Sequence, residues 1–194
     1  MPRAAAPSLK VRALQWLAQR EHSRLELRRK LLRHARLLDA AREAARAAAA
    51  IDADAGIDPA PDFEERSPAT VRAEAAAEVE AVLDALEAER HLSDARFVES
   101  RVNARVARYG NRRIQQELQQ HGTTLDEAGR AQLKSSEMLR ARTLWQRRFG
   151  HAPATPGDAA ARAKQMRFLA GRGFSPDVIR QVLRGPAEDD DAAA

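Results

Sequence analysis

Residues 23–35 read SRLELRRKLLRHA, and residues 110–122 read GNRRIQQELQQHG. The two segments share one pattern, because Leu27 coincides with Ile114 and a second aliphatic residue follows each of them four positions later. This spacing places apolar side chains on one face of a helix. A weaker third copy, RAKQMRFLAGRG at 162–173, lies 51 residues after the second. The recurrence predicts an array of similar helical repeats.

The two spacings between the copies differ, and an insertion accounts for the difference. The first two copies are 87 residues apart, and the alanine-rich, acidic stretch 37–72 is 36 residues long. Without it, both spacings are 51 residues. We therefore predict three three-helix repeats, at 8–91, 92–135 and 136–185, with the insertion inside the first. An acidic, disordered tail at 186–194 is predicted to follow them.

Helix-start signals recur along the chain. Ser23 to Glu26 forms a capping box, and Ser67 precedes the proline that is favoured at the first helical position. Thr124 to Glu127 reads as a second capping box, and a further helix is predicted over 136–149. No stretch alternates with a period of two long enough for a strand, so the predicted fold class is all-α.

Composition excludes several classes of protein. The chain has no cysteine, which removes disulfide scaffolds, cysteine-based zinc sites and thiol chemistry. It has no run of 18 apolar residues and no signal-peptide hydrophobic region near its start, so we expect a cytoplasmic protein without membrane contact. Alanine supplies about half of the 44% hydrophobic residues, which favours thin helical layers over one thick core.

Charge is distributed in blocks. Residues 1–50 carry 12 basic and 4 acidic side chains, residues 51–100 carry 4 and 14, and residues 101–150 carry 11 and 4. Of the 33 basic residues 29 are arginine, whose planar guanidinium binds phosphates and carboxylates through paired hydrogen bonds. Such a polarised chain is typical of a protein that binds a charged partner.

The sharpest local feature is a row of arginines at helical spacing, within about 60° of one helix face. Its members are Arg101, Arg105, Arg108 and Arg112. The row can face phosphates or acidic side chains of a partner. The alternative is a solvated face whose aliphatic stems cover the neighbouring valines.

Other basic residues are weaker candidates for binding a partner or DNA. Arg29, Arg33 and Arg36 share one face of the helix that follows the first capping box. The remaining candidates are Arg147, Arg148 and Arg172.

No catalytic or metal site emerges from the sequence. The histidines show no pair at i, i+4 and no metal-ligand spacing, and His34 and His121 are predicted beside helix C-termini. Gly171 and Gly173 are typical of a helix C-cap, because no strand precedes them as in a phosphate-binding loop. No nucleophile, base and orienting group come together, so we expect neither an enzyme nor a cofactor.

Four motifs in order resemble the RecX regulatory proteins, which modulate the RecA recombinase. They are ALQWLAQREHSRLELRRKL at 13–31, LSDARF at 92–97, the GNRRI…EL…G pattern at 110–122 and LAGRGF at 169–174. The resemblance implies an elongated, curved array of three-helix repeats. It also implies a monomer that binds RecA, chiefly as the RecA–DNA filament, and restrains ATPase and strand exchange, with weak DNA binding and no catalysis.

Two other classes of function stay open at this point. A stand-alone helical DNA-binding protein would bind a specific site without RecA. Against it, the arginine row has few base-reading Asn or Gln neighbours, although four glutamines follow within 115–120. A structural or RNA-associated adaptor would have partners unrelated to recombination.

Overall fold

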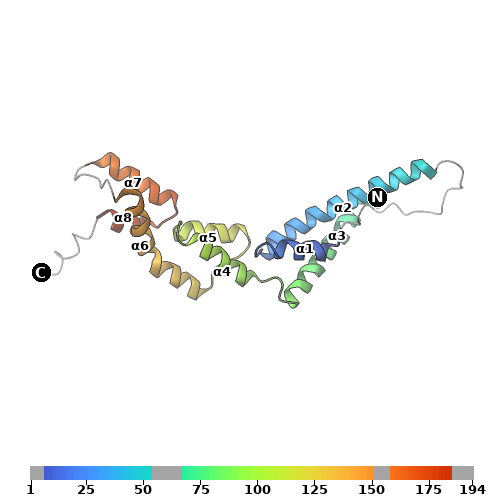
Figure 1. Cartoon of the computed structure of the whole chain (residues 1–194), viewed down its shortest axis with the longest axis horizontal. Coiled ribbons are helices and arrows are strands. Elements are labelled where there is room, and N and C mark those ends of the chain that lie inside the picture. The colour runs from blue at the N-terminus through green and yellow to red at the C-terminus, as the bar shows by residue number, and fades with distance from the viewer. Residues whose placement is uncertain (1–6, 54–66, 151–157, 185–194) are drawn as a thin grey trace. The chain divides into compact units, whose positions relative to one another are not determined.

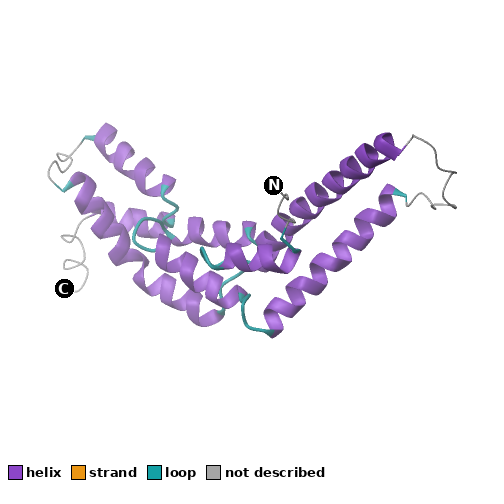
Figure 2. Cartoon of the chain, turned by 45° about the vertical axis from the view of Figure 1, so that its right-hand side comes forward, coloured by secondary structure: helices purple, strands orange, loops and turns teal. Residues whose placement is uncertain are grey.

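The structure, a computed structural model, describes residues 7–53, 67–150 and 158–184. Within these ranges the secondary structure is helical without a strand, which confirms the predicted all-α class (Figure 2). The chain divides into two compact units, the first unit at residues 1–94 and the second unit at residues 95–194. The boundaries of the three predicted repeats stay a prediction.

In the first unit the described residues form three helices that pack around one apolar core (Figure 1). They are α1 (Leu9–Leu17), α2 (Arg24–Ala53) and α3 (Pro68–Ala88). Leu27 and Leu31, the apolar pair of the first repeat copy, are fully buried together with Leu83 of α3. Burying a leucine side chain stabilises the fold by about 1.5–3 kcal/mol. The periodic pattern therefore identified the core face of α2 correctly.

Serine hydroxyls cap the described helices of the first unit, and Ser23 and Ser67 do so as predicted. The Ser8 hydroxyl accepts a hydrogen bond from the Val11 N–H, and the Ser67 hydroxyl accepts one from Thr70 N–H at 3.2 Å. At the start of α2 the Ser23 hydroxyl accepts the Glu26 N–H at 3.1 Å. Each hydroxyl satisfies a backbone donor that the helix itself cannot pair.

The described residues of the second unit form five helices and two clusters of buried apolar residues. The helices are α4 (Asp94–Arg105, beginning at the last residue of the first unit), α5 (Asn111–Gln120), α6 (Glu127–Phe149), α7 (Ala159–Gly171) and α8 (Pro176–Arg184). One cluster centres on Phe97 and Ile114, and the other on Leu169 and Phe174. α6 contributes Leu133 to the first and Ala141 to the second, so one continuous helix links both clusters.

The start of α6 is a correction to the sequence prediction. The helix begins at Glu127 rather than Ser136, and its N-cap is Asp126 rather than Thr124. The Asp126 carboxylate accepts the Gly129 N–H at 2.7 Å, and no helix-breaking residue follows until Gly150. An aspartate aligned with the first turn competes better for the cap than a threonine two residues earlier.

The bounds of the predicted insertion, residues 37 and 72, do not coincide with the ends of the helices. α2 continues through residue 37 to Ala53, and α3 already begins at Pro68. An alanine-rich segment continues a helix readily, because alanine has the highest helix propensity. His34 therefore lies inside α2 rather than beside its C-terminus, whereas His121 does cap the end of α5. The predicted tail at 186–194 lies outside the described residues.

Candidate functional site

The α4–α5 turn and the α7–α8 turn touch through their backbones in the second unit. The Gly110 N–H donates to the Arg172 carbonyl at 2.9 Å, and the Arg112 N–H donates to the Gly173 carbonyl at 3.1 Å. A Cβ on Gly110 would lie 2.3 Å from the Phe174 nitrogen. Gly173 has φ +83°, and its Cβ would lie 2.6 Å from the Arg113 Cβ. Only glycine fits such a close approach, so both turns are held in one arrangement.

One buried carboxylate caps two helices beside these turns. Glu137 of α6 is 5% exposed, and its Oε1 accepts the N–H groups of Asn111 at 3.0 Å and Ser175 at 3.3 Å. Its Oε2 accepts the Ser175 hydroxyl at 3.2 Å. Asn111 begins α5 and Ser175 directly precedes α8, so the negative charge lies at the positive ends of both helix dipoles. Sequence reasoning did not find this residue.

Arg140, one turn after Glu137 on α6, holds the preceding turn in place. Its guanidinium donates to the carbonyls of Tyr109 at 2.7 Å and Leu133 at 3.0 Å, and to the Asn111 side chain. Burial lowers the pKa of Arg140, and the Glu137 carboxylate opposes that shift. The ordinary pKa of arginine is so high that the group stays charged. Glu137 and Arg140 together fix the walls of the neighbouring groove.

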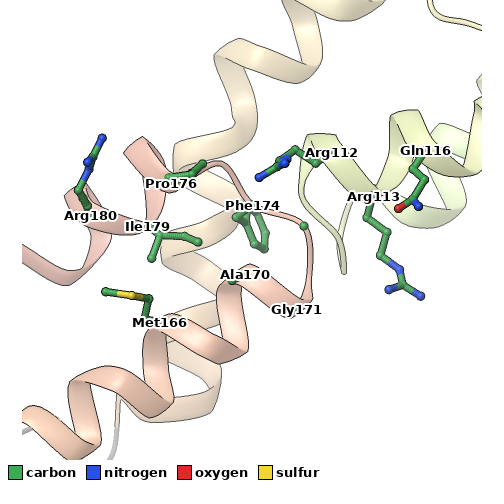
Figure 3. Close-up of a pocket in the computed structure, with 11 residues that line it drawn as sticks. Arg112, Arg113, Gln116, Met166, Ala170, Gly171, Phe174, Pro176, Ile179 and Arg180 are labelled. Carbon is green, nitrogen blue, oxygen red and sulfur yellow. The ribbon is translucent and has the colours of Figure 1, made fainter.

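An open groove of about 580 Å³ lies between α5, α7 and α8, and we call it the Arg-rimmed groove (Figure 3). Its rim carries Arg112, Arg113 and Arg180. Its floor is apolar and consists of Met166, Ala170, Phe174, Pro176 and Ile179. Figure 3 shows the Arg112 side chain extending toward the turn that carries Phe174, whereas the guanidinium groups of Arg113 and Arg180 point away from the floor.

The predicted arginine row does not lie on one helix. α4 ends at Arg105, Arg108 lies in the following turn, and Arg112 belongs to α5. The helix ends because the chain turns toward Gly110, whose backbone must meet the Arg172–Gly173 backbone. The prediction of a single stripe is therefore wrong, although all four residues belong to the second unit.

The first two members of the row are paired with a carboxylate of α5. Glu117 accepts three hydrogen bonds from Arg105, at 3.0, 3.1 and 3.2 Å, and its Oε1 lies 3.4 Å from Arg101 Nη1. The Glu117 carboxylate raises the pKa of Arg105. A partner that binds these two arginines must therefore compete with Glu117.

The remaining arginines of this region surround Tyr109. Arg113 lies 4.9 Å and Arg172 5.6 Å from the centre of the Tyr109 ring, and Arg172 also lies 5.3 Å from the Phe168 ring. Stacking on aromatic rings orients a guanidinium without neutralising it. Arg113 and Arg180 were missed by sequence reasoning, because helical spacing does not group them with the others.

The outer candidates have fewer partners. Arg147 and Arg148 are exposed in the last turn of α6, where Arg148 lies 6.0 Å from the Phe149 ring. In the first unit Arg29, Arg33 and Arg36 are exposed on α2, and within the described part of the chain none of them forms an ion pair.

Other basic residues of α2 are neutralised by the acidic block of the sequence. Arg24 contacts Glu80 at 2.9 Å, Asp84 at 2.8 Å and Glu87 at 2.7 Å, all on α3. Although burial lowers it, the hydrogen bonds that the Arg24 guanidinium donates to Asp84 and Glu80 raise the pKa of Arg24. The exposed arginine face of α2 is therefore separate from the face that packs against α3.

Two structural features are absent from the described residues. Among them, no group of three or more histidines and carboxylates is arranged to hold a metal ion. Nor does any helix in the described ranges have the length and apolar character needed to cross a membrane.

Comparison with known proteins assigns the chain to a family. A protein named Regulatory protein RecX from Ralstonia nicotianae is 43% identical over 180 residues, which cover 92% of this chain and 87% of that protein. This chain belongs to the RecX family. Another RecX relative, from Leptothrix cholodnii, is 45% identical over 179 residues, covering 91% of this chain and 88% of its own. The resemblance seen in the four sequence motifs is confirmed.

Family models and a solved RecX structure agree with the helical architecture. The model described as RecX, second three-helix domain, matches residues 93–124, and that described as RecX, third three-helix domain, matches residues 136–183. The crystal structure of RecX from Lactobacillus salivarius is similar with a TM-score of 0.55. It covers 91% of this chain and 92% of that one at 18% identity, so it supports the fold alone.

Proposed function

We propose that this chain is a cytoplasmic, non-catalytic regulator of recombination and DNA repair that binds RecA and RecA–DNA filaments. It lowers RecA ATPase and strand-exchange activity, acts as a monomer and binds DNA only weakly by itself. The observation that carries the proposal is membership of the RecX family, with relatives named Regulatory protein RecX at 43% and 45% identity over most of the chain.

The charged surfaces of both units support this function. Arg29, Arg33 and Arg36 in the first unit are exposed and have no ion pair within the described residues. In the second unit Arg112 and Arg113 are exposed at the rim of the Arg-rimmed groove. Unpaired arginines of this kind attract phosphates of DNA or carboxylates of a filament surface, and such contacts weaken as salt rises.

The test is RecA ATPase on single-stranded DNA, titrated with the full chain at two salt concentrations and with RecA from the same organism. We expect ATP turnover to fall already when less than one regulator is present per RecA. The inhibition is expected to weaken at the higher salt concentration. Unchanged turnover at excess regulator would refute the proposal. With DNA binding intact, that outcome would favour the stand-alone DNA-binding alternative.

Charge reversal on α2 tests whether the exposed arginine face takes part. Arg29→Glu combined with Arg33→Glu is expected to raise the concentration needed for half-inhibition. Arg42→Glu is the matched control, because Arg42 lies on the same helix but pairs with Asp39. Equal inhibition by the double variant and the control would exclude this face from the interface.

A further inference from the structure

We propose that the Arg-rimmed groove is the docking site for an acidic protein segment that inserts one bulky apolar side chain between flanking carboxylates. The inference rests on the proposed function only for the protein that supplies the segment, which is taken to be RecA. It adds the location of the contact and the chemistry that is recognised there.

The floor of the groove is suited to bind an apolar side chain. Met166 is 45% exposed, whereas Phe174 and Ile179, which line the same groove, are 2% and 4% exposed. A flexible thioether adapts to an incoming aliphatic or aromatic group, and covering it removes apolar surface from water. The volume of about 580 Å³ is large enough for a side chain with its neighbouring backbone.

The arginines of the rim are suited to bind carboxylates of a partner. Within the described residues neither Arg112 nor Arg113 has an acidic partner, and the third rim arginine, Arg180, pairs with Asp177 of its own helix. Glu137 does not neutralise the rim, because it is buried and accepts backbone N–H groups. Because Arg112 and Arg180 lie on either side of Pro176 (Figure 3), acidic residues are needed on both sides of the apolar one.

The same features disfavour nucleic acid as the occupant. A sugar–phosphate backbone would pair with the arginines but would leave the methionine uncovered. Base stacking needs an accessible ring, and Phe174, the aromatic residue of the floor, is almost fully buried. A protein segment satisfies both the floor and the rim.

The groove is preformed, which lowers the cost of binding. Its walls meet at the backbone contact between Gly110 and the Arg172–Phe174 turn, and Glu137 ties the starts of α5 and α8 together. A ligand therefore does not have to order these elements on binding.

Photo-crosslinking tests the floor. The full chain carries p-benzoyl-phenylalanine in place of Met166 and is irradiated with RecA filaments on single-stranded DNA. We expect a crosslink to one RecA peptide that contains an apolar residue flanked by Asp or Glu. No crosslink to protein, a crosslink to DNA, or a crosslink to a peptide without acidic residues would overturn the inference.

Charge reversal tests the rim with the same readout. Arg112→Glu with Arg180→Glu should weaken the crosslink and raise the concentration for half-inhibition about tenfold, because two attractive contacts become repulsive. Arg142→Glu is the control, since Arg142 is an exposed residue of α6 outside the groove. Position 112 lies in the first turn of α5, where an acidic residue suits the helix dipole, and circular dichroism checks the fold.

The two possible failures are distinguishable. If the unsubstituted chain inhibits RecA but the crosslink is absent or the rim variants act like Arg142→Glu, the groove inference fails and the proposed function stands. If the unsubstituted chain does not inhibit RecA at all, the proposed function fails, and the inference with it.

Discussion

Removing the Glu137 carboxylate is the most direct test of how the second unit is assembled. Glu137→Ala deprives three donors of their acceptor, namely the Asn111 N–H, the Ser175 N–H and the Ser175 hydroxyl. Loss of one helix N-cap costs about 0.5–2 kcal/mol, and here α5 and α8 both lose theirs. Arg140 also loses a neighbouring negative charge. We expect the free energy of unfolding of the second unit to fall by about 3 kcal/mol.

The assay is urea unfolding followed by tryptophan fluorescence in the full chain. Trp16 lies in the first unit and Trp145 in the second, so a Trp16→Phe background makes the signal specific for the second unit. Glu137→Gln keeps one acceptor oxygen and is expected to cost less than half as much as Glu137→Ala.

The matched control is Glu127→Ala on the same helix. The Glu127 side chain is 91% exposed and pairs only with Arg130 within the described residues. It should change the free energy of unfolding by less than about 0.5 kcal/mol. If Glu137→Ala costs as little as this control, the carboxylate does not hold the two helix starts together and the reasoning is refuted.

Three further predictions concern other parts of the chain. Gly173→Ala should destabilise the second unit by at least about 1 kcal/mol in the same unfolding assay, because φ of Gly173 is positive and the added Cβ would meet Arg113. The control is Gly171→Ala, whose Cβ meets nothing within 4 Å and which should be neutral or slightly stabilising. Burial lowers the pKa of His22 below 6.5, and its Nε2 lies 2.6 Å from Lys30 Nζ, so the folded state holds a neutral ring. The unfolded state therefore takes up more protons as pH falls through about 6.5, and the first unit should lose stability between pH 7 and 5.5; a His22→Asn variant that keeps the same pH slope would contradict this. Finally, Arg101→Glu with Arg105→Glu should weaken inhibition of the RecA ATPase if these arginines reach the filament. Glu117→Gln removes the carboxylate that pairs with both arginines, so it should strengthen the inhibition. Unchanged inhibition by both variants would show that Arg101 and Arg105 lie outside the interface.

Local signals in the sequence were sufficient for the helical class and for the core faces of α2 and α5. Leu27 and Leu31 in α2, and Ile114 and Leu118 in α5, are buried as their spacing predicted. α2 begins at Arg24 and α5 at Asn111, 87 residues apart, as the repeat alignment requires. These features depend on residues three or four positions apart, so they can be recognised without knowing the tertiary fold.

Local signals failed where two caps or two helix segments compete. Thr124 and Asp126 both resemble N-caps, and the structure uses the aspartate. The arginine row was predicted on one face of one helix. In the structure the chain turns before Gly110, because the backbone of the α7–α8 turn contacts Gly110. Helical spacing carries no information about a contact made by residues about sixty positions further along the chain.

The sequence by itself determined the helical class, most helix starts, the core faces and the family. Only the tertiary structure decided which arginines are neutralised and which border a groove. Arg105 pairs with Glu117 on the next helix, while Arg112, Arg113 and Arg180 line one groove from two different helices. Glu137 caps residues that lie 26 and 38 positions away in the chain. Periodicity reports the neighbours of a residue along its own helix, whereas charge pairing and capping across helices arise only when distant segments pack together.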